Sequence, residues 1–332
     1  MMNPEITILM SVYNEEEYLQ KAINSILNQT FTNFEFIIID DGSIDDSLKD
    51  IRSFSDTRIK VISNKKNLGL ADSLNKGITL ATGKYIARMD ADDIAHSNRL
   101  AIQFNFLEKH PEVGILGSFC QLFDDKSDKI GVFLVPIFDL AIRWTSLLNC
   151  PFAHPSVMMR RHLLIEHNLR YDGQFKATED YNLWTELLKY TKSFNLNYPL
   201  VRYRLRNGIT NSKRQQQLKE HDFIAHRTIR TTLPDFSITP EQVTLMRSLL
   251  ITENFFDETG ILKVDKLKEA IAIYLSMLSA FLNTYATHPE KNRLKRQEIH
   301  KITRLLLRLS KRSGFNNVLA PHLQQLTQLL WR

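Results

Sequence analysis

The sequence predicts an α/β fold, in which a mostly parallel sheet is flanked by helices and followed by a helical C-terminal region. Short, nearly continuous apolar runs alternate with segments of helical periodicity over the first third of the chain, a pattern typical of βαβ units. The apolar runs are rich in β-branched residues, as are strands buried on both faces of a sheet. From about residue 209 onward, nearly every segment has helical periodicity.

The predicted elements follow from these runs in order. Strands are expected at residues 6–12, 34–39, 59–62 and 84–89, with helices at 18–27 and 70–80. The acids at positions 15–17 favour the start of the first helix through the helix macrodipole. Further along, a helix is expected at 98–109, short strands at 113–119 and 129–135, a loop feeding a strand at 150–160, and an amphipathic helix at 179–189.

Composition and charge narrow the class of protein. The chain has 332 residues, of which 43% are hydrophobic and 24% charged, as in soluble globular proteins. Its two cysteines suggest neither a disulfide framework nor a metal site, and its N-terminus does not read as a signal peptide, which favours a cytosolic location. The longest apolar stretch, residues 270–282, is interrupted by two serines and predicts a buried helix rather than a membrane span. The net charge of +6 suits an anionic partner without choosing among nucleic acid, membrane and nucleotide phosphate.

Polar clusters follow three of the predicted strands. They are residues 13–15, 40–43 and 90–93. Ligands of open α/β sheets bind beyond the carboxyl ends of the strands. We therefore expect these three clusters to converge on one crevice.

The cluster Asp90-Ala-Asp92-Asp93 suits a divalent metal. Two carboxylates one residue apart can share Mg²⁺ or Mn²⁺, which prefer oxygen ligands and often bridge to substrate phosphates. Such a cation neutralises charge on a departing diphosphate. An acidic turn that caps the next helix explains the same residues equally well.

Two further acidic pairs admit two interpretations each. Asp40 or Asp41, at a strand end before Gly42, can accept a hydrogen bond from a base or a ribose, or can belong to a turn with Ser43 as helix N-cap. Glu179-Asp180 opens a helix and can supply a general base, whose pKa the helix N-terminus is expected to lower. The same pair can simply stabilise the first helical turn.

The order of these motifs resembles the family 2 inverting glycosyltransferases of bacterial cell-surface polysaccharide synthesis. The resemblance covers residues 5 to about 205 and rests on several motifs in sequence. They are Ile-Leu-Met-Ser-Val-Tyr-Asn-Glu at 8–15, Ile-Asp-Asp-Gly-Ser at 39–43, Asn-Leu-Gly at 67–69, Asn-Lys-Gly at 75–77, Tyr-Ile-Ala-Arg-Met-Asp-Ala-Asp-Asp at 85–93 and Glu-Asp at 179–180. Together they are far more specific than any one of them alone.

The resemblance implies a GT-A fold and a division of the chain. It implies a catalytic domain at 1–207, made of a nucleotide-binding half at 1–95 and an acceptor half at 96–207, followed by a helical region at 208–332. The implied reaction is transfer of a sugar from a nucleotide-diphosphate sugar, by default a UDP-sugar, to a glycan or lipid-linked glycan. Mn²⁺ or Mg²⁺ is the implied cofactor.

The resemblance also implies roles for single residues. Ser11, Tyr13 and Glu15 would line the nucleotide pocket. Asp40, with Asp41 beside it, would contact the base of the nucleotide. Asp90 would approach the ribose and Asp92 would hold the metal. Asp180 would be the catalytic base, with Glu179 next to it.

Three other candidates keep two interpretations. Arg88 can contact phosphate or pair with a neighbouring carboxylate. His154 resembles a residue near the acceptor side, or is a structural histidine with satisfied hydrogen bonds. Trp184 can stack on a sugar but sits on a helix face typical of core.

The sequence also departs from the processive members of the superfamily. Their Gln-x-x-Arg-Trp signature and their membrane spans are not evident, and Tyr203-Arg204 follows the last predicted strand as in non-processive relatives. We therefore expect one sugar to be transferred per reaction.

The basic charge is concentrated late in the chain. Between Lys291 and Arg312 there are nine Lys and Arg residues and one acid, Glu298. Apolar residues recur there at helical spacing, namely Ile299, Ile302, Leu305, Leu306 and Leu309. The basic residues between them are Lys301, Arg304, Arg308, Lys311 and Arg312. A basic amphipathic helix can lie on the anionic inner face of a membrane, or can pack on the protein with its basic face in solvent.

Rival functions remain at this point. A related nucleotidyltransferase would use similar carboxylates but needs a basic, Gly-rich loop after the first strand, where this chain has Tyr-Asn-Glu-Glu-Glu. A catalytically silent nucleotide-sugar-binding or scaffold protein is the alternative from another class. Nucleic-acid binding is disfavoured, since no recognition module is present.

Overall fold

The computed structural model describes residues 3–206, 211–249 and 263–313, with the side chains of 211–213 and 309–313 left out. The chain divides into two compact units, Met1–His221 and Asp222–Arg332. The predicted boundary at 207/208 lies at residues outside the described ranges, and the division between the units falls within α8 (Asn211–Thr232). Each unit is described on its own.

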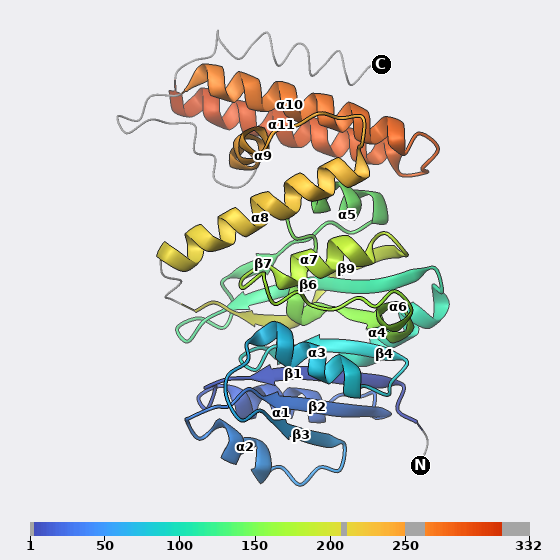
Figure 1. Ribbon diagram of the computed structural model, residues 1–332, viewed down its shortest axis with the longest axis vertical. Helices are drawn as coiled ribbons and strands as arrows, with labels where there is room; N and C mark the ends of the chain where they lie inside the picture. The colour runs from blue at the N-terminus through green and yellow to red at the C-terminus, as the bar shows by residue number, and fades with distance from the viewer. Residues whose placement is uncertain (1–2, 207–210, 250–262, 314–332) are drawn as a thin grey trace. The chain divides into compact units, whose positions relative to one another are not determined.

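The first unit is built on one nine-stranded sheet, with strand order β3-β2-β1-β4-β8-β6-β9-β5 and β7 paired to β6 (Figure 1). Its first half is parallel and comprises β1 (Ile6–Val12), β2 (Phe34–Asp40), β3 (Ile59–Ser63) and β4 (Tyr85–Met89). These are the four strands predicted from the buried apolar runs. The predicted α/β fold is thus confirmed.

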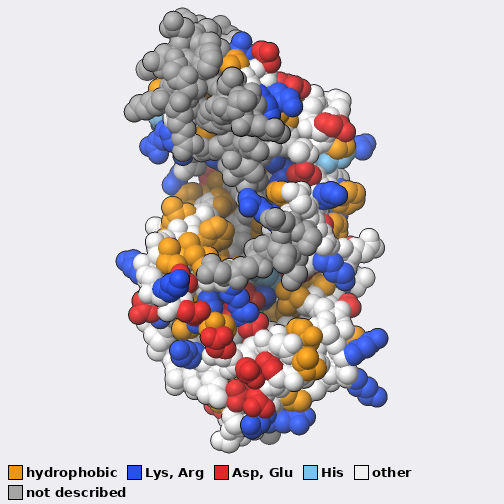
Figure 2. Space-filling model, turned by 90° about the vertical axis from the view of Figure 1, so that its left-hand side faces the viewer, with side chains coloured by type: hydrophobic (Ala, Val, Ile, Leu, Met, Phe, Trp, Pro, Cys, Tyr) orange, Lys and Arg blue, Asp and Glu red, His pale blue; other side chains and the backbone are white. Residues whose placement is uncertain are grey.

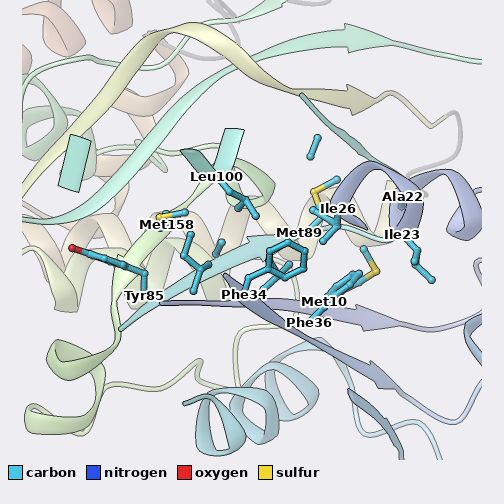
Figure 3. Packing of buried hydrophobic residues seen from close by; sticks show 14 of the residues in the cluster. Met10, Ala22, Ile23, Ile26, Phe34, Phe36, Tyr85, Met89, Leu100 and Met158 are labelled. Atoms are coloured by element: carbon cyan, nitrogen blue, oxygen red, sulfur yellow. The ribbon is translucent and has the colours of Figure 1, made fainter. Parts of the chain in front are cut away.

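Helices cover both faces of the parallel half, which explains why its strands are apolar throughout. The helices are α1 (Leu19–Leu27), α2 (Ser47–Ser53), α3 (Leu70–Leu80) and α4 (Arg99–Lys109). On one face, Met10 and Phe36 pack with Ile23 of α1 and Leu100 of α4 (Figure 3). On the other face, neighbouring residues of the same strands pack against α3, so successive side chains alternate between two cores.

The second half of the sheet mixes directions. It comprises β5 (Ile94–Ala95), β6 (Val113–Phe123), β7 (Gly131–Phe133), β8 (Met158–Arg160) and β9 (Lys192–Arg204). β8 runs antiparallel to both β4 and β6, whereas β9 runs parallel to β6 with register shifts. Around it lie α5 (Asp139–Ser146), a 3₁₀ turn (His154–Ser156), α6 (Arg161–Glu166) and α7 (Glu179–Leu187).

The second unit is helical, as predicted for the C-terminal region. It contains the end of α8 with α9 (Pro240–Arg247), α10 (Val264–Thr284) and α11 (Lys291–Ser313). Thr239 and Gln242 form a capping box at the start of α9. Within the described ranges, none of the helices combines the length and apolar character that crossing a bilayer requires.

The segment at 270–282 lies in α10 and is the buried helix that the sequence predicts. Ile271, Tyr274 and Phe281 are almost completely buried. On α11 the apolar residues Ile299, Ile302, Leu305 and Leu306 are buried, while Lys301, Arg304 and Arg308 are exposed. The side chains of Leu309, Lys311 and Arg312 lie outside the described residues.

Candidate active site

The parallel strands bring the three polar clusters to one edge of the sheet. β1 and β2 pair in register so that Val12 lies opposite Asp40, and Met10 of β1 lies opposite Met89 of β4. The residues that follow each strand therefore leave the sheet at the same edge. The expected convergence of the three clusters is what this register produces.

The loop after β1 and the loop after β2 are joined by hydrogen bonds. The Asn14 N–H donates to Ser43 Oγ at 3.1 Å, and the Glu15 N–H donates to Ser47 Oγ at 2.8 Å. Tyr13 at this turn is 43% exposed and Ser11 is half-buried in β1. The turn after β2 needs glycine at position 42, because its φ is +74° and a Cβ there would lie 2.7 Å from the backbone of Lys66.

Asp40 and Asp41 are both buried but have different partners. One oxygen of Asp40 accepts the Ser43 N–H at 3.2 Å. The Asp41 carboxylate accepts the N–H groups of Leu68 and Gly69 at 3.0 and 2.9 Å, and the Asn64 amide at 2.8 Å. Asp41 thus holds the loop that leads into α3, while Asp40 has fewer hydrogen bonds to protein groups.

Three carboxylates gather at the end of β4. Within the described ranges, Asp90, Asp92 and Asp93 form one group whose oxygens lie within 4.8 Å of one another. Burial and the neighbouring Asp90 raise the pKa of Asp92 and, more strongly, that of Asp93. Several carboxylate oxygens crowded at a partly buried site are the donor set that hard divalent cations take. The residues present therefore fit the metal that the motif implies.

Arginines balance part of this negative charge. Arg88 is buried and its Nη1 pairs with Asp90. Of the two roles considered for Arg88, this is the pairing with a neighbouring carboxylate. Arg206 places Nε 2.6 Å from Asp92 Oδ2 and also pairs with Glu15. Arg206 thus connects the cluster after β1 with the cluster after β4.

Arg206 and Arg204 were not predicted as site residues. The Arg204 N–H donates to Asp93 at 2.8 Å, and its Nε donates to the Asp92 carbonyl at 3.0 Å. Arg204 is the last residue of β9 and Arg206 follows it by two positions, more than 100 residues from the acids. The signal that could have identified them is the alternation of arginine at 202, 204 and 206, since alternate residues of an extended chain point to the same side.

Glu179 and Asp180 occupy the first turn of α7. Glu179 is 7% exposed, and Asp180 is more accessible. Burial, followed by repulsion from Asp180, raises the pKa of Glu179 to about 7. Burial also raises the pKa of Asp180, although hydrogen bonds from the Tyr181 N–H and the Cys150 thiol oppose this change.

The Tyr181 N–H at the helix N-terminus lowers the pKa of Asp180, as predicted, but the net shift is upward, so the expected low pKa is not found. Removing a carboxylate from water outweighs the attraction of the helix dipole at this position. Asp90 also raises the pKa of both Glu179 and Asp180. The two acidic clusters are thus within electrostatic reach of each other, as one site requires.

His154 and Trp184 belong to an aromatic group under this site. His154 Nε2 and the Tyr171 hydroxyl are 2.9 Å apart, and burial lowers the pKa of His154 well below its usual range, so the ring is neutral. Trp184 is fully buried and meets His154 and Phe152 edge to face. Of the two roles considered for Trp184, sugar stacking and core packing, the structure shows core packing.

The loop that leads into α7 is held by α8. The Glu220 carboxylate accepts the N–H groups of Lys176 and Ala177 at 3.1 and 3.0 Å and the Thr178 hydroxyl at 2.9 Å. Gln216, one turn earlier on α8, donates to the same carboxylate at 2.8 Å. The residue before Glu179 is thus tied to a helix that begins after the sheet is complete.

The family signature of glycosyl transferase family 2 matches residues 7–167. An uncharacterized glycosyltransferase of Haemophilus influenzae is 35% identical over 219 residues, which are 63% of this chain and 68% of that protein. The chain belongs to glycosyl transferase family 2. This family 2 glycosyltransferase is also 31% identical over 217 residues to the UDP-Glc:alpha-D-GlcNAc-diphosphoundecaprenol beta-1,3-glucosyltransferase WfgD of Escherichia coli, covering 64% of this chain and 82% of WfgD.

Solved structures share the fold. Staphylococcus aureus TarS 1–349 in complex with UDP-GlcNAc superposes with a TM-score of 0.61 at 18% identity, over 93% of this chain and 92% of that one. The mannosyltransferase PcManGT of Pyrobaculum calidifontis, in complex with GDP-Man and Mn²⁺, gives a TM-score of 0.53 at 15% identity, over 99% and 86% of the two chains. The expected GT-A fold is confirmed for this family 2 glycosyltransferase.

Proposed function

We propose that this glycosyltransferase moves one sugar, with inversion, from a nucleotide-diphosphate sugar to a hydroxyl of a glycan or lipid-linked glycan. The observation that carries the proposal is the arrangement of two acidic groups of different character. Asp90, Asp92 and Asp93 form a metal-type cluster at strand ends, and Glu179 and Asp180 lie within electrostatic reach of it.

The donor would lie across the carboxyl ends of β1, β2 and β4. Asp40 accepts fewer hydrogen bonds from the protein than Asp41 does, so it would accept a hydrogen bond from the nucleobase. Ser11 and Tyr13 would line the pocket. Asp90 would meet the ribose. UDP is the expected nucleotide, since WfgD is named for UDP-Glc and the TarS complex holds UDP-GlcNAc.

Asp92, with oxygens of Asp90 and Asp93 beside it, would hold Mn²⁺ or Mg²⁺. The cation supplies positive charge to the leaving diphosphate. Family 2 enzymes generally use a divalent metal, and the PcManGT complex contains Mn²⁺. Arg206, which pairs with Asp92 and Glu15, is placed to offer a second positive charge at the same position.

Asp180 would act as the general base. Its carboxylate takes the proton of the acceptor hydroxyl while the acceptor oxygen forms a bond to the anomeric carbon. The bond from that carbon to the phosphate oxygen breaks on the opposite face, and the nucleoside diphosphate leaves with the electron pair. Attack from the face opposite the leaving group inverts the anomeric configuration. Burial and the neighbouring Asp90 raise the pKa of both Asp180 and Glu179.

The names of the relatives and the charge of α11 support a proposal for the acceptor and the cellular location. WfgD is named for an acceptor linked to diphosphoundecaprenol, and a polysaccharide-building role on such a lipid suits this chain. The enzyme would work in the cytoplasm, peripherally on the inner face of the membrane. The helix α11 has a basic face, made of the exposed residues Lys301, Arg304 and Arg308, that could bind an anionic membrane surface.

A donor screen tests the proposal. Thermal shift and calorimetry against UDP-, GDP- and dTDP-sugars, each with Mn²⁺, Mg²⁺ or EDTA, should show one donor class that stabilises the protein only with metal. Asp92→Ala should lower that affinity at least tenfold in Mn²⁺, because it removes a ligand from the cluster. Glu5→Ala, outside the site, is the control. Metal-independent binding of unchanged strength in Asp92→Ala would refute the metal role.

A further inference from the structure

The β6–β7 hairpin carries the most exposed apolar surface of the sheet. Residues 126–134, called here the hairpin surface, include Ile130, Val132, Phe133 and Leu134, which are 46%, 41%, 43% and 66% exposed. The strand β7 is three residues long and pairs only with β6 among the described strands. Apolar side chains exposed side by side on both faces of an edge strand differ from the scattered exposure that is normal on protein surfaces.

The tip of the hairpin carries two lysines among three acids, two of which pair with arginines. Lys126 and Lys129 are exposed, and no described residue pairs with their ammonium groups. Two of the three neighbouring acids are balanced by arginines, whereas the hydrogen bonds to Asp124 come from backbone groups and leave its charge in place, so the tip keeps a small excess of positive charge. Asp124 accepts the N–H groups of Lys126 and Ser127, Asp125 pairs with Arg204, and Asp128 pairs with Arg202.

The hairpin is joined directly to the candidate active site. Asp125 pairs with Arg204 and accepts the Tyr18 hydroxyl at 3.1 Å. Arg204 in turn donates to the Asp92 carbonyl and to the Asp93 carboxylate. Figure 2 shows hydrophobic side chains gathered in the middle of this face, beside Lys and Arg side chains and above Asp and Glu side chains.

We propose that the hairpin surface binds an anionic lipid bilayer and brings the active site to the membrane-borne acceptor. The apolar side chains enter the boundary between headgroups and acyl chains, and Lys126 and Lys129 pair with lipid phosphates. The proposal rests on the proposed lipid-linked acceptor, for which it supplies the surface of contact.

A bilayer suits the hairpin surface better than a protein partner does. Stable protein interfaces bury about 800 Å² and about 20–30 residues on each side, whereas this surface offers four apolar side chains on a short strand. A bilayer needs no matching shape. Apolar side chains with lysines at their edge are the combination that interfacial anchors use.

Vesicle co-sedimentation of the full chain tests the proposal without any donor or acceptor. The wild type should bind phosphatidylglycerol-containing vesicles more tightly than pure phosphatidylcholine vesicles. The double variant Phe133→Ser/Leu134→Ser should bind the anionic vesicles at least ~10-fold more weakly. Lys126→Gln/Lys129→Gln should lose most of the preference for anionic lipid and the salt dependence that accompanies it.

The matched control is Ile165→Ser on α6, where the side chain is 45% exposed, and it should bind as the wild type does. Equal vesicle binding by Phe133→Ser/Leu134→Ser and the wild type would overturn the proposal, since another surface would then do the binding. A change from dimer to monomer in that variant, seen by light scattering, would also overturn it in favour of contact between two copies. Donor hydrolysis by the hairpin variants should stay at the wild-type rate, so failure here is separable from failure of the proposed reaction.

Discussion

Buried carboxylates dominate the candidate active site. Glu179 and Asp180 are adjacent, removed from water, and repelled by Asp90, so each ionises less readily than an ordinary acid. A general base works only in its ionised form. If Asp180 is the base that we propose, burial moves the pH at which it becomes active towards neutrality.

The pH dependence of turnover follows from this shift. Since the pKa of Glu179 is raised to about 7 and that of Asp180 is also raised, activity should fall as pH drops through a limb well above the ordinary carboxyl range of about 4. Rates of nucleoside diphosphate release between pH 5 and 9 at saturating donor measure it. Cys150→Ala, which removes a hydrogen bond that lowers the pKa of Asp180, should move the limb to higher pH. A flat profile down to pH 5 would contradict the assignment.

At this scale the sequence predicts acids better than their partners. Asp92 and Asp180 stand out because each lies in a short motif next to a predicted strand or helix. Arg206 and Cys150 contact the acids because the fold brings distant segments of the chain together. No local sequence pattern shows such a contact. The sign of the pKa shift was missed for the same reason, since burial is a tertiary property.

At the scale of elements, α8 contacts α7 and the loop before it through Glu220, Gln217 and His221. Glu220 accepts three hydrogen bonds from residues 176–178, directly before Glu179. We assign it as a positioning residue. Removing its charge should loosen the loop that aims Glu179 and Asp180, without touching the donor.

Glu220→Gln should lower kcat about tenfold with donor KM nearly unchanged, because small misplacement of a catalytic group is costly. Steady-state kinetics separate the two parameters, and the acidic limb of the pH profile should broaden or shift. Lys219→Gln on the same helix is exposed and serves as control. Equal losses of stability and donor affinity in Glu220→Gln would indicate a purely structural role.

Secondary structure was predictable where strands are buried on both faces. β1, β2 and β4 are mostly apolar and buried along almost their whole length, and their bounds match the prediction to within one residue. β9 was predicted without bounds, and Tyr203-Arg204, expected to follow the last strand, lie inside it. Its 13 residues contain two asparagines and Pro199, and its pairing with β6 shifts register. Such irregular strands form because a neighbouring strand supplies the register, which the local sequence does not show.

At the scale of the whole molecule, the amphipathic pattern of α11 is explained by its packing. Its apolar residues Ile302 and Leu306 are completely buried within the second unit, so helix packing explains their spacing. Its basic residues Lys301, Arg304 and Arg308 are exposed, together with Leu307. The sequence could not separate packing from membrane insertion, because both require the same periodicity.

The central claim is that Asp180 removes a proton in an inverting transfer from a metal-bound nucleotide sugar. Asp180→Asn tests it most directly, with nucleoside diphosphate release from the donor found in the screen, in Mn²⁺, measured beside donor affinity by calorimetry. The variant should bind donor within about threefold of wild type while turnover falls at least ~100-fold, the usual contribution of general-base catalysis. Turnover by Asp180→Asn near the wild-type rate would contradict the account.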